Sequence, residues 1–200
     1  MTILHTVWRW VKWPLAILVV AYIALVIYRL PAVGEKQRTA DAVAHIQAQK
    51  ITMADVMGTN LPPQPYEPEN DATVAGLDKN NNGIRDDVEL AIFAKYPHSA
   101  KIRAAELQYA LADQLILTQV FNADTWIAVA EQQSRAYACV GESIPTKDLA
   151  TLISRTKEVD DLVFNTQIRN SAKDQSYSFT TSYALPDTDL CDIDLNSLSN

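Results

Sequence analysis

Histidine and cysteine are scarce in this sequence, with three and two residues among 200, and the common short motifs of enzymes are missing. We find no H-E-x-x-H, no G-x-S-x-G and no phosphate-binding glycine-rich loop. His5, His45 and His98 are far apart, and nothing in the sequence pairs them with a nucleophile. We interpret them as surface or helix-end residues, and the sequence predicts no catalytic residue.

Acidic residues are absent before position 34, whereas the rest of the chain is strongly acidic. Arg9, Lys12 and Arg29 are the charged residues of that first stretch, and the remainder carries 14 basic and 24 acidic residues. Such a balance repels nucleic acid and anionic lipid, and it favours cations or basic partners. Because no basic patch is present, the sequence predicts no binding to nucleic acid.

One long apolar run lies near the N-terminus. Residues 13–28 read WPLAILVVAYIALVIY, with Lys12 and Arg29 beside them. As a helix rising about 1.5 Å per residue, this run nearly crosses a ~30 Å hydrocarbon core, and basic and aromatic flanks complete the span. The stretch YRLPAVG lacks the small residues of a signal-peptide cleavage site, and a buried core helix would show amphipathic spacing. We therefore expect an uncleaved transmembrane anchor. The flanking aromatic residues are Trp8, Trp10, Trp13 and Tyr28.

The two cysteines, Cys139 and Cys191, have neither metal-ligand nor redox-motif spacing. Two distant cysteines in an anchored protein suggest a disulfide and an oxidising compartment, although two separate buried thiols remain an alternative. The bridge would close a loop of about 50 residues and stabilise the fold by roughly 3–4 kcal/mol. It also predicts the topology, because the basic residues on the two sides of the run do not decide it: the N-terminus is cytoplasmic and the domain is outside, which in a bacterium is the periplasm.

The remaining patterns predict a mainly α-helical protein with an extended C-terminal tail. Thr52 can begin a short helix that Gly58 ends, and four prolines between Leu61 and Asn70 exclude a regular helix there. The expected organisation is a cytoplasmic N-terminus (1–12), a transmembrane anchor (13–30), a membrane-proximal helical segment (31–60), a proline-rich linker (61–77) and a calcium-loop and helical domain (78–200).

Residues that can cap a helix N-terminus precede three later helical patterns, at Ser99, at Asn122 or Asp124, and at Thr146. Further along, alternation from Tyr177 to Tyr183 predicts one short strand or an extended edge. In the helix after Thr146, the residues expected to face inward are Leu149, Leu152, Ile153, Val159 and Val163.

Residues 78–89 read DKNNNGIRDDVE and match the calcium-loop pattern D-x-[DN]-x-[DN]-G-x5-E at every specified position. Ca²⁺ prefers six to eight oxygen ligands, and alternate side chains of such a loop can surround it. Gly83 supplies the sharp turn. The predicted ligands are the side chains of Asp78, Asn80, Asn82, Asp86 and Glu89 and the backbone carbonyl of Ile84, whose side chain is free to enter the core.

The loop resembles that of the EF-hand, and more closely the dockerin-like and thrombospondin-type calcium loops of bacterial proteins. The resemblance covers residues 78–89 only and implies a bound Ca²⁺. It departs from the EF-hand in three respects: Gly76 and the proline-rich stretch precede the loop in place of a helix, no second loop follows, and Arg85 occupies a usually apolar position. These departures favour a structural corner over a calcium switch. An asparagine-rich turn that binds nothing is the alternative.

The function that these features favour is non-enzymatic: a calcium-binding protein of the cell envelope that binds an envelope or secreted protein. It would act as a chaperone, a secretion or assembly accessory, or an inhibitor. One alternative is a calcium-dependent hydrolase of envelope polymers, which needs clustered carboxylates or a histidine in a cleft. Another is a purely structural or calcium-sensing envelope module. The acidic tail, with Asp187, Asp189, Asp192 and Asp194, is interpreted as a solvated terminus.

Overall fold

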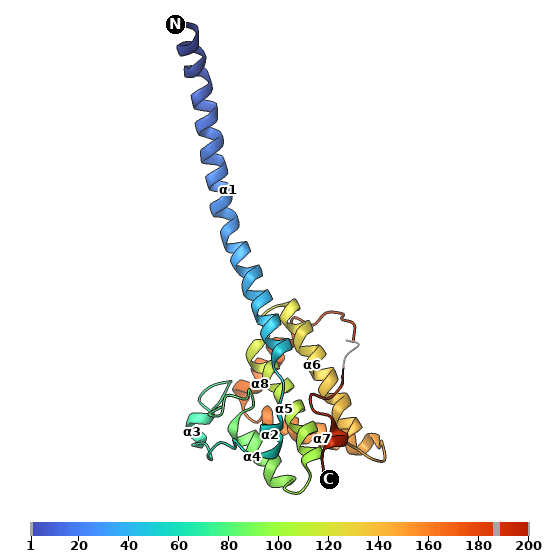
Figure 1. Ribbon diagram of the computed structural model, residues 1–200. Helices are drawn as coiled ribbons and strands as arrows, with labels where there is room; N and C mark the ends of the chain where they lie inside the picture. Colours follow the sequence, from blue (N-terminus) through green and yellow to red (C-terminus); the bar gives the residue numbers. More distant parts are fainter. Residues whose placement is uncertain (1, 186–188, 200) are drawn as a thin grey trace. The chain divides into compact units, whose positions relative to one another are not determined.

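The computed structural model describes residues 2–185 and 189–199, and within them it contains helices and no β-strand (Figure 1). The predicted mainly α-helical class is confirmed. The chain divides into two compact units, one ending at Asp41 and the other beginning at Ala42. Of the two alternatives predicted from Tyr177 onward, the short strand is wrong, because Tyr177 is the last residue of a helix and the described residues 178–185 contain no strand. Tyr183 nevertheless reaches another segment, since its hydroxyl lies 2.7 Å from Ser134 Oγ.

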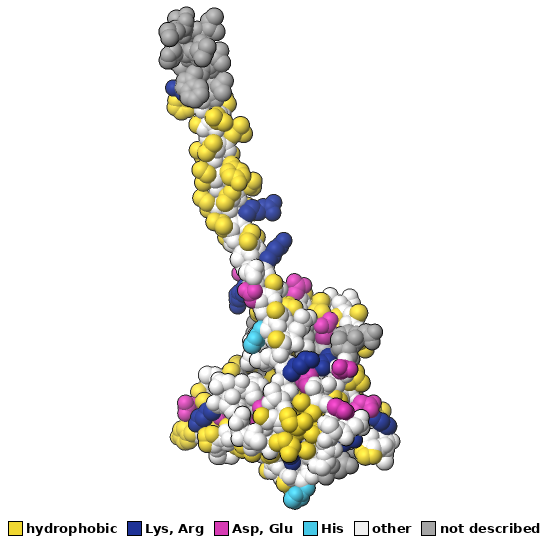
Figure 2. Space-filling model, in the orientation of Figure 1, with side chains coloured by type: hydrophobic (Ala, Val, Ile, Leu, Met, Phe, Trp, Pro, Cys, Tyr) yellow, Lys and Arg dark blue, Asp and Glu magenta, His cyan; other side chains and the backbone are white. Residues whose placement is uncertain are grey.

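Helix α1 (Thr2–Ala48) contains the apolar run and continues across residues 30 and 31 without a break. Its most apolar window of 18 residues has a mean hydropathy of 2.2 and is not buried at all, so the helix is long and apolar enough to span a membrane. Figure 2 shows hydrophobic side chains along this part of α1. Pro14 and Pro31 both lie inside α1. The side chains of His5, Trp8 and Trp10 are outside the described part.

Two short helices follow α1. Helix α2 (Met53–Met57) begins after a capping box, in which Thr52 and Asp55 each accept a hydrogen bond from the other's backbone N–H, and Gly58 ends it in the left-handed conformation at φ +71°. The proline-rich stretch is irregular until α3 (Glu67–Asn70), so the prediction of no regular helix between Leu61 and Asn70 is wrong for these last four residues. The proline of α3 lies in its first turn, where the missing N–H needs no partner within the helix. The predicted start and end of α2 are therefore found.

Helix α5 (Ala100–Gln119) is the centre of the second unit. It contacts α2, α4 (Asp86–Lys95), α6 (Ala123–Glu142), α7 (Leu149–Val163), α8 (Gln167–Tyr177) and the 3-10 helix η1 (Leu195–Ser197) (Figure 1). Fifteen of its twenty residues are buried. A helix surrounded in this way shows no one-sided apolar stripe. It also buries polar residues, among them Glu106 and Asp113.

The side chains that start these helices were largely predictable. Ser99 caps α5 and Asn122 caps α6, as expected. The prediction for Thr146 is wrong: Lys147 adopts φ +52°, which delays the helix, and Asp148 accepts the hydrogen bond from Thr151 N at 2.8 Å instead.

Helix α7 is also rotated relative to its predicted inner face. Val159 and Val163 are buried as expected, but Leu149 and Ile153 are 61% and 53% exposed. The reason is an ion pair in the core, because Arg155 Nε donates to Glu106 Oε1 of α5 at 2.5 Å and both side chains are buried. Turning Arg155 inward leaves Leu149 and Ile153 in solvent.

Candidate functional site

Residues 78–84 form a tight loop that is shaped by its own side chains. Asp78 Oδ1 and Oδ2 accept hydrogen bonds from Asn82 N at 3.2 Å and Gly83 N at 2.9 Å, and Asn82 Oδ1 accepts one from Ile84 N at 2.9 Å. Gly83 has φ +86°, a conformation that side chains disfavour. The first part of the sequence motif therefore folds the chain back on itself, as the spacing predicts.

The second part of the motif closes the loop. Asp86 Oδ1 accepts a hydrogen bond from Lys79 N at 2.9 Å, and Asp86 N donates to Leu77 O at 2.8 Å. Asn80 Nδ2 donates to Glu89 Oε2 at 2.9 Å. The structure thus brings Asp86 and Glu89, in the first turn of α4, next to the residues of the loop. The side chain of Ile84 is 1% exposed and enters the core, as expected.

Two carboxylates of the loop are buried without full compensation. Asp86 and Glu89 are 0% and 1% exposed, and neither Asp86 Oδ2 nor Glu89 Oε1 has a hydrogen-bond partner among the described residues. Burial raises the pKa of Glu89 to about 7, against the opposing hydrogen bonds of Asn80 and Asn82. Burial also raises the pKa of Asp86. Both groups need a proton or a cation nearby.

Arg85 does not supply that positive charge. Its guanidinium is fully buried and donates to the carboxylate of Asp87 and to the carbonyl oxygens of Leu162 and Val163 at the end of α7. The arginine that departs from the usual loop pattern therefore ties the loop to α7 and leaves the charge of Asp86 and Glu89 in place.

The donor set fits a hard cation in kind, because carboxylate, amide and carbonyl oxygens are the ligands that Ca²⁺ prefers. Among the residues that the structure describes, no group of three or more His, Cys, Asp or Glu side chains is placed to hold a metal ion. Amide N–H groups of Asn80 and Asn82 stand between the carboxylates instead. A cation at this place would take over the role of these uncharged donors.

Asp55 of α2 also contacts the loop, and no pattern in the sequence predicts this contact. Its side chain is 7% exposed, and Asn82 Nδ2 lies 3.4 Å from Asp55 Oδ1. Thr52 begins α2 as predicted, but the contact of Asp55 with Asn82 joins residues 27 positions apart. Such a contact depends on the packing of α2 and leaves no local pattern.

The chain that leads into the loop is fixed by a buried arginine of α8. Arg169 is 0% exposed and donates to the carbonyl oxygens of Asn70, Thr73 and Val74 and to the carboxylate of Asp71. Arg169 Nη1 lies 2.7 Å from Asp71 Oδ1. The lead-in therefore depends on α8, which is a long way off in sequence.

A second acidic cluster lies deep between the helices. Asp113 of α5 is fully buried, accepts a hydrogen bond from Gln133 Nε2 at 3.2 Å, and faces Asp160 of α7. Tyr109 Oη donates to Asp160 Oδ1 at 3.2 Å. Burial, and then the charge of Asp160, hold the pKa of Asp113 well above its usual range. Asp113 Oδ2 accepts no hydrogen bond within the described part of the chain. Because an ionised carboxylate only accepts hydrogen bonds, Asp113 must be protonated to donate one to Asp160.

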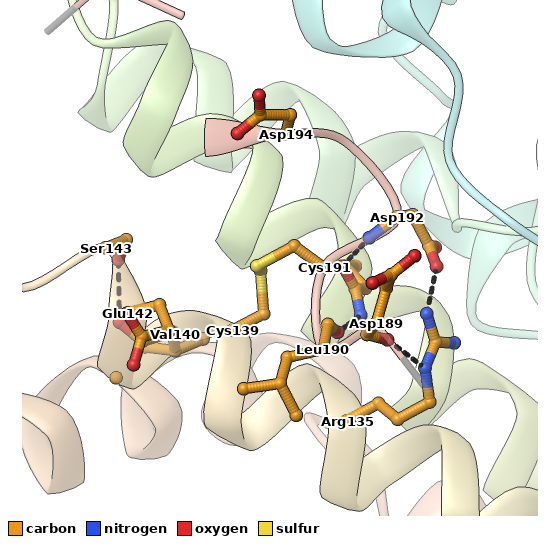
Figure 3. Close-up of a disulfide and its surroundings, with 12 residues drawn as sticks. Arg135, Cys139, Val140, Glu142, Ser143, Asp189, Leu190, Cys191, Asp192 and Asp194 are labelled. Carbon is orange, nitrogen blue, oxygen red and sulfur yellow. Dashed lines mark hydrogen bonds and ion pairs between the residues drawn. A yellow bond between two sulfur atoms is a disulfide. The ribbon is translucent and has the colours of Figure 1, made fainter. Parts of the chain in front are cut away.

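The C-terminal tail is held against α5 and α6. Cys139 and Cys191 form the predicted disulfide, with a Cα–Cα distance of 5.0 Å (Figure 3). Beside it, Arg135 Nε donates to Asp189 O at 2.8 Å and Arg135 Nη2 to Asp192 Oδ1 at 2.9 Å (Figure 3). Asp192 is consequently part of a buried ion pair, which corrects the prediction of a solvated acidic tail at this residue. Asp187 is outside the described residues.

A scan against protein-family models, a search of curated proteins and a search of solved structures found no match to this chain. Its function has to be inferred from its own residues.

The structure describes the side chains of two histidines. His45 and His98 are exposed, and His45 contacts the amide of Gln49 on the following turn. Burial raises the pKa of three carboxyls, those of Asp86 and Glu89 at the loop and that of Asp113 in the core.

Proposed function

We propose that this protein is anchored in a membrane by α1, that its helical domain lies outside the cytoplasm, and that residues 78–89 bind Ca²⁺ as a structural ion. We propose further that it acts without catalysis, by binding an envelope or secreted protein. The observation that carries the calcium proposal is the pair of buried, partnerless oxygens of Asp86 and Glu89. Leaving such oxygens without a cation costs free energy that a bound ion would recover.

The proposed topology rests on α1 and on the disulfide. A helix with the length and apolarity of α1 suits a bilayer, and a bond between Cys139 and Cys191 persists in an oxidising compartment. In a bacterium this places the domain in the periplasm. A reporter enzyme that is active only in an oxidising compartment, fused after residue 200, is expected to be active. Activity only of a cytosolic reporter at the same position would contradict the topology.

Calorimetry on the full chain in detergent tests the calcium proposal. We expect heat on titration with millimolar Ca²⁺, a higher melting temperature, and no large change in circular dichroism, since a structural ion stabilises without rearrangement. Glu89→Gln removes one charged ligand and should abolish most of both effects. Glu69→Gln is the matched control, because Glu69 is exposed on α3. A large shape change on binding would favour a calcium sensor instead.

Exposed apolar side chains of the domain support a protein partner. Leu149 and Ile153 lie one turn apart on α7 and are 61% and 53% exposed, and Met53 and Met57 on α2 are exposed in the same spacing. If these residues bind a partner, the full-length protein should recover an envelope or secreted protein from membranes in stoichiometric amount. The double variant Leu149→Ser/Ile153→Ser should lose it. Equal recovery of the partner by the unaltered protein and by the double variant would argue against Leu149 and Ile153 as the binding surface.

The Asp113–Asp160 pair favours the alternative of an envelope hydrolase, because two neighbouring carboxyls can act as acid and base. Asp160 is half-buried, and Asp113 has a raised pKa. Under this alternative the purified chain would hydrolyse an envelope polymer, and Asp113→Asn would stop it. Absence of hydrolysis across such polymers, with calcium present, would remove this alternative.

A further inference from the structure

The calcium loop is attached by two hydrogen bonds to the segment that follows the membrane helix, residues 49–60. Asn82 Nδ2 lies 3.4 Å from Asp55 Oδ1, and Asn80 Nδ2 donates to Asn60 O at 3.0 Å. At the turn, a Cβ on Gly83 would lie 2.8 Å from Gln49 Oε1. The loop is therefore built against a second stretch of chain, which the twelve-residue motif does not include.

Asp55 is the acidic residue of that stretch, and one of its oxygens is available. Its Oδ2 accepts hydrogen bonds from Thr52 N and Thr52 Oγ1, both at 2.7 Å, as part of the helix cap. Its Oδ1 faces the amide of Asn82 at a distance that makes a weak hydrogen bond. The Asn82 amide thus faces the carboxylate of Asp55, and Asn80 Nδ2 donates to Glu89 Oε2 at 2.9 Å, so side-chain amides of the loop contact carboxylates from two different segments.

The charges make an uncharged amide a poor partner at this position. Asp55, Asp86 and Glu89 are all at least nine-tenths buried. One oxygen each of Asp86 and Glu89 lacks a hydrogen-bond partner within the described residues. A divalent cation can neutralise such a group of carboxylates, whereas an amide N–H contributes only a dipole.

We propose that Asp55 is a ligand of the calcium ion, supplied from outside the loop, and that calcium thereby clasps residues 49–60 onto the domain. This inference rests on the proposed function, in which the loop binds calcium. When calcium binds, Asp55 Oδ1 and the oxygens of Asp86 and Glu89 contact the ion in place of amide N–H groups. Since α2 begins four residues after α1 ends, the order of the connection to the membrane helix then depends on the calcium concentration outside the cytoplasm.

The test compares calcium affinity in the full chain, in detergent, by calorimetry with CaCl₂ alone. Asp55→Asn keeps the size of the side chain and removes its charge, and it should weaken binding by about tenfold or more, because ligand charge sets the affinity of such sites. Thr52→Val is the matched control: it removes the hydroxyl that bonds Asp55 but keeps every carboxylate. Its affinity should stay within about twofold of that of the unaltered chain.

The outcomes separate the two proposals. No heat with the unaltered chain overturns the calcium function and this inference together. Calcium binding by the unaltered chain, with Asp55→Asn within about twofold of it, leaves the calcium function standing and overturns the clasp. Hydrogen exchange on the unaltered chain gives a second measurement that needs no variant: calcium should slow exchange at residues 53–57 as well as in the loop. Slowing confined to the loop would also overturn the clasp.

Discussion

The domain buries two acidic clusters, and they differ in how their charge is handled. At the loop, Asp78 and Asp86 accept backbone N–H groups, and Asn80 and Asn82 bring amides between the carboxylates. In the core, Asp113 faces another carboxyl, Asp160, with the charge of Lys173 nearby. Gln133 donates a hydrogen bond to Asp113, and Tyr109 donates one to Asp160.

The comparison shows that burial alone does not define a cation site. A carboxyl that faces a second carboxyl can keep its proton, so that one hydrogen bond replaces two charges. A loop that points several oxygens at one place, while backbone N–H groups fix their directions, has no such partner and suits an ion. The core pair should therefore respond to pH, whereas the loop should respond to calcium and, because burial raises the pKa of Glu89 to about 7, to pH as well.

Replacing Arg169 of α8 tests whether the stability and calcium affinity of the loop depend on the helices around the core pair. Arg169→Met leaves Asp71 and the carbonyls of the lead-in without their donor, and we expect a loss of about 3 kcal/mol in the free energy of unfolding, because breaking a buried ion pair leaves its polar partners unpaired. Denaturant unfolding measures it. Calcium affinity should fall as well, since Arg169 fixes the chain that enters the loop. Lys157→Met, in an exposed pair with Asp161, is the control and should cost at most ~0.5 kcal/mol.

Calcium itself should stabilise the domain by about 2.7 kcal/mol when present at a hundred times its dissociation constant. The gain should persist in Asp113→Asn and disappear in Glu89→Gln, because only the second residue belongs to the loop. Chelator titration followed by thermal unfolding would show this. A gain lost in both variants would mean that the two clusters are coupled.

The core pair should make stability fall as pH rises. The folded-state pKa of Asp113 lies above its unfolded value, so the stabilisation from its proton is complete below the unfolded pKa and is lost as pH rises toward and through the folded pKa. In chelator, the unaltered chain should lose about 1.4 kcal/mol per pH unit relative to Asp113→Asn, starting near pH 4. Asp160, Lys173, Tyr109 and Tyr177 are the other titratable groups around it. Parallel pH profiles for the two proteins would show that Asp113 does not hold a proton.

The smallest effect is expected from Tyr109→Phe. The change removes the hydroxyl that donates to Asp160 Oδ1 at 3.2 Å and keeps the ring, so it should cost about 1 kcal/mol. Calcium affinity should be unaltered, which calorimetry checks. Tyr137→Phe provides a control on an exposed tyrosine of α6, and an equal loss there would show that the hydrogen bond to Asp160 contributes nothing.

Local patterns predicted the parts of the fold that depend on a few neighbouring residues. Ser99 and Asn122 cap their helices because the bonding groups are three positions apart, and Asp78 folds the loop through similarly local bonds, to groups four and five positions away. Prediction was wrong where a distant residue decided the outcome. Leu149 and Ile153 are exposed because Arg155 is drawn inward to Glu106, and periodicity within α7 carries no information about that ion pair.

The sequence by itself determined the helical class, an apolar helix long enough for a membrane, the turn at Gly83 and the oxygen-rich loop, since each is encoded within about twenty consecutive residues. Only the tertiary structure decided that Asp55 lies against Asn82, that Asp113 faces Asp160 and that Arg169 holds the entry to the loop. These contacts join segments between 27 and 99 positions apart. They arise from how helices pack around α5, which no single stretch of residues specifies.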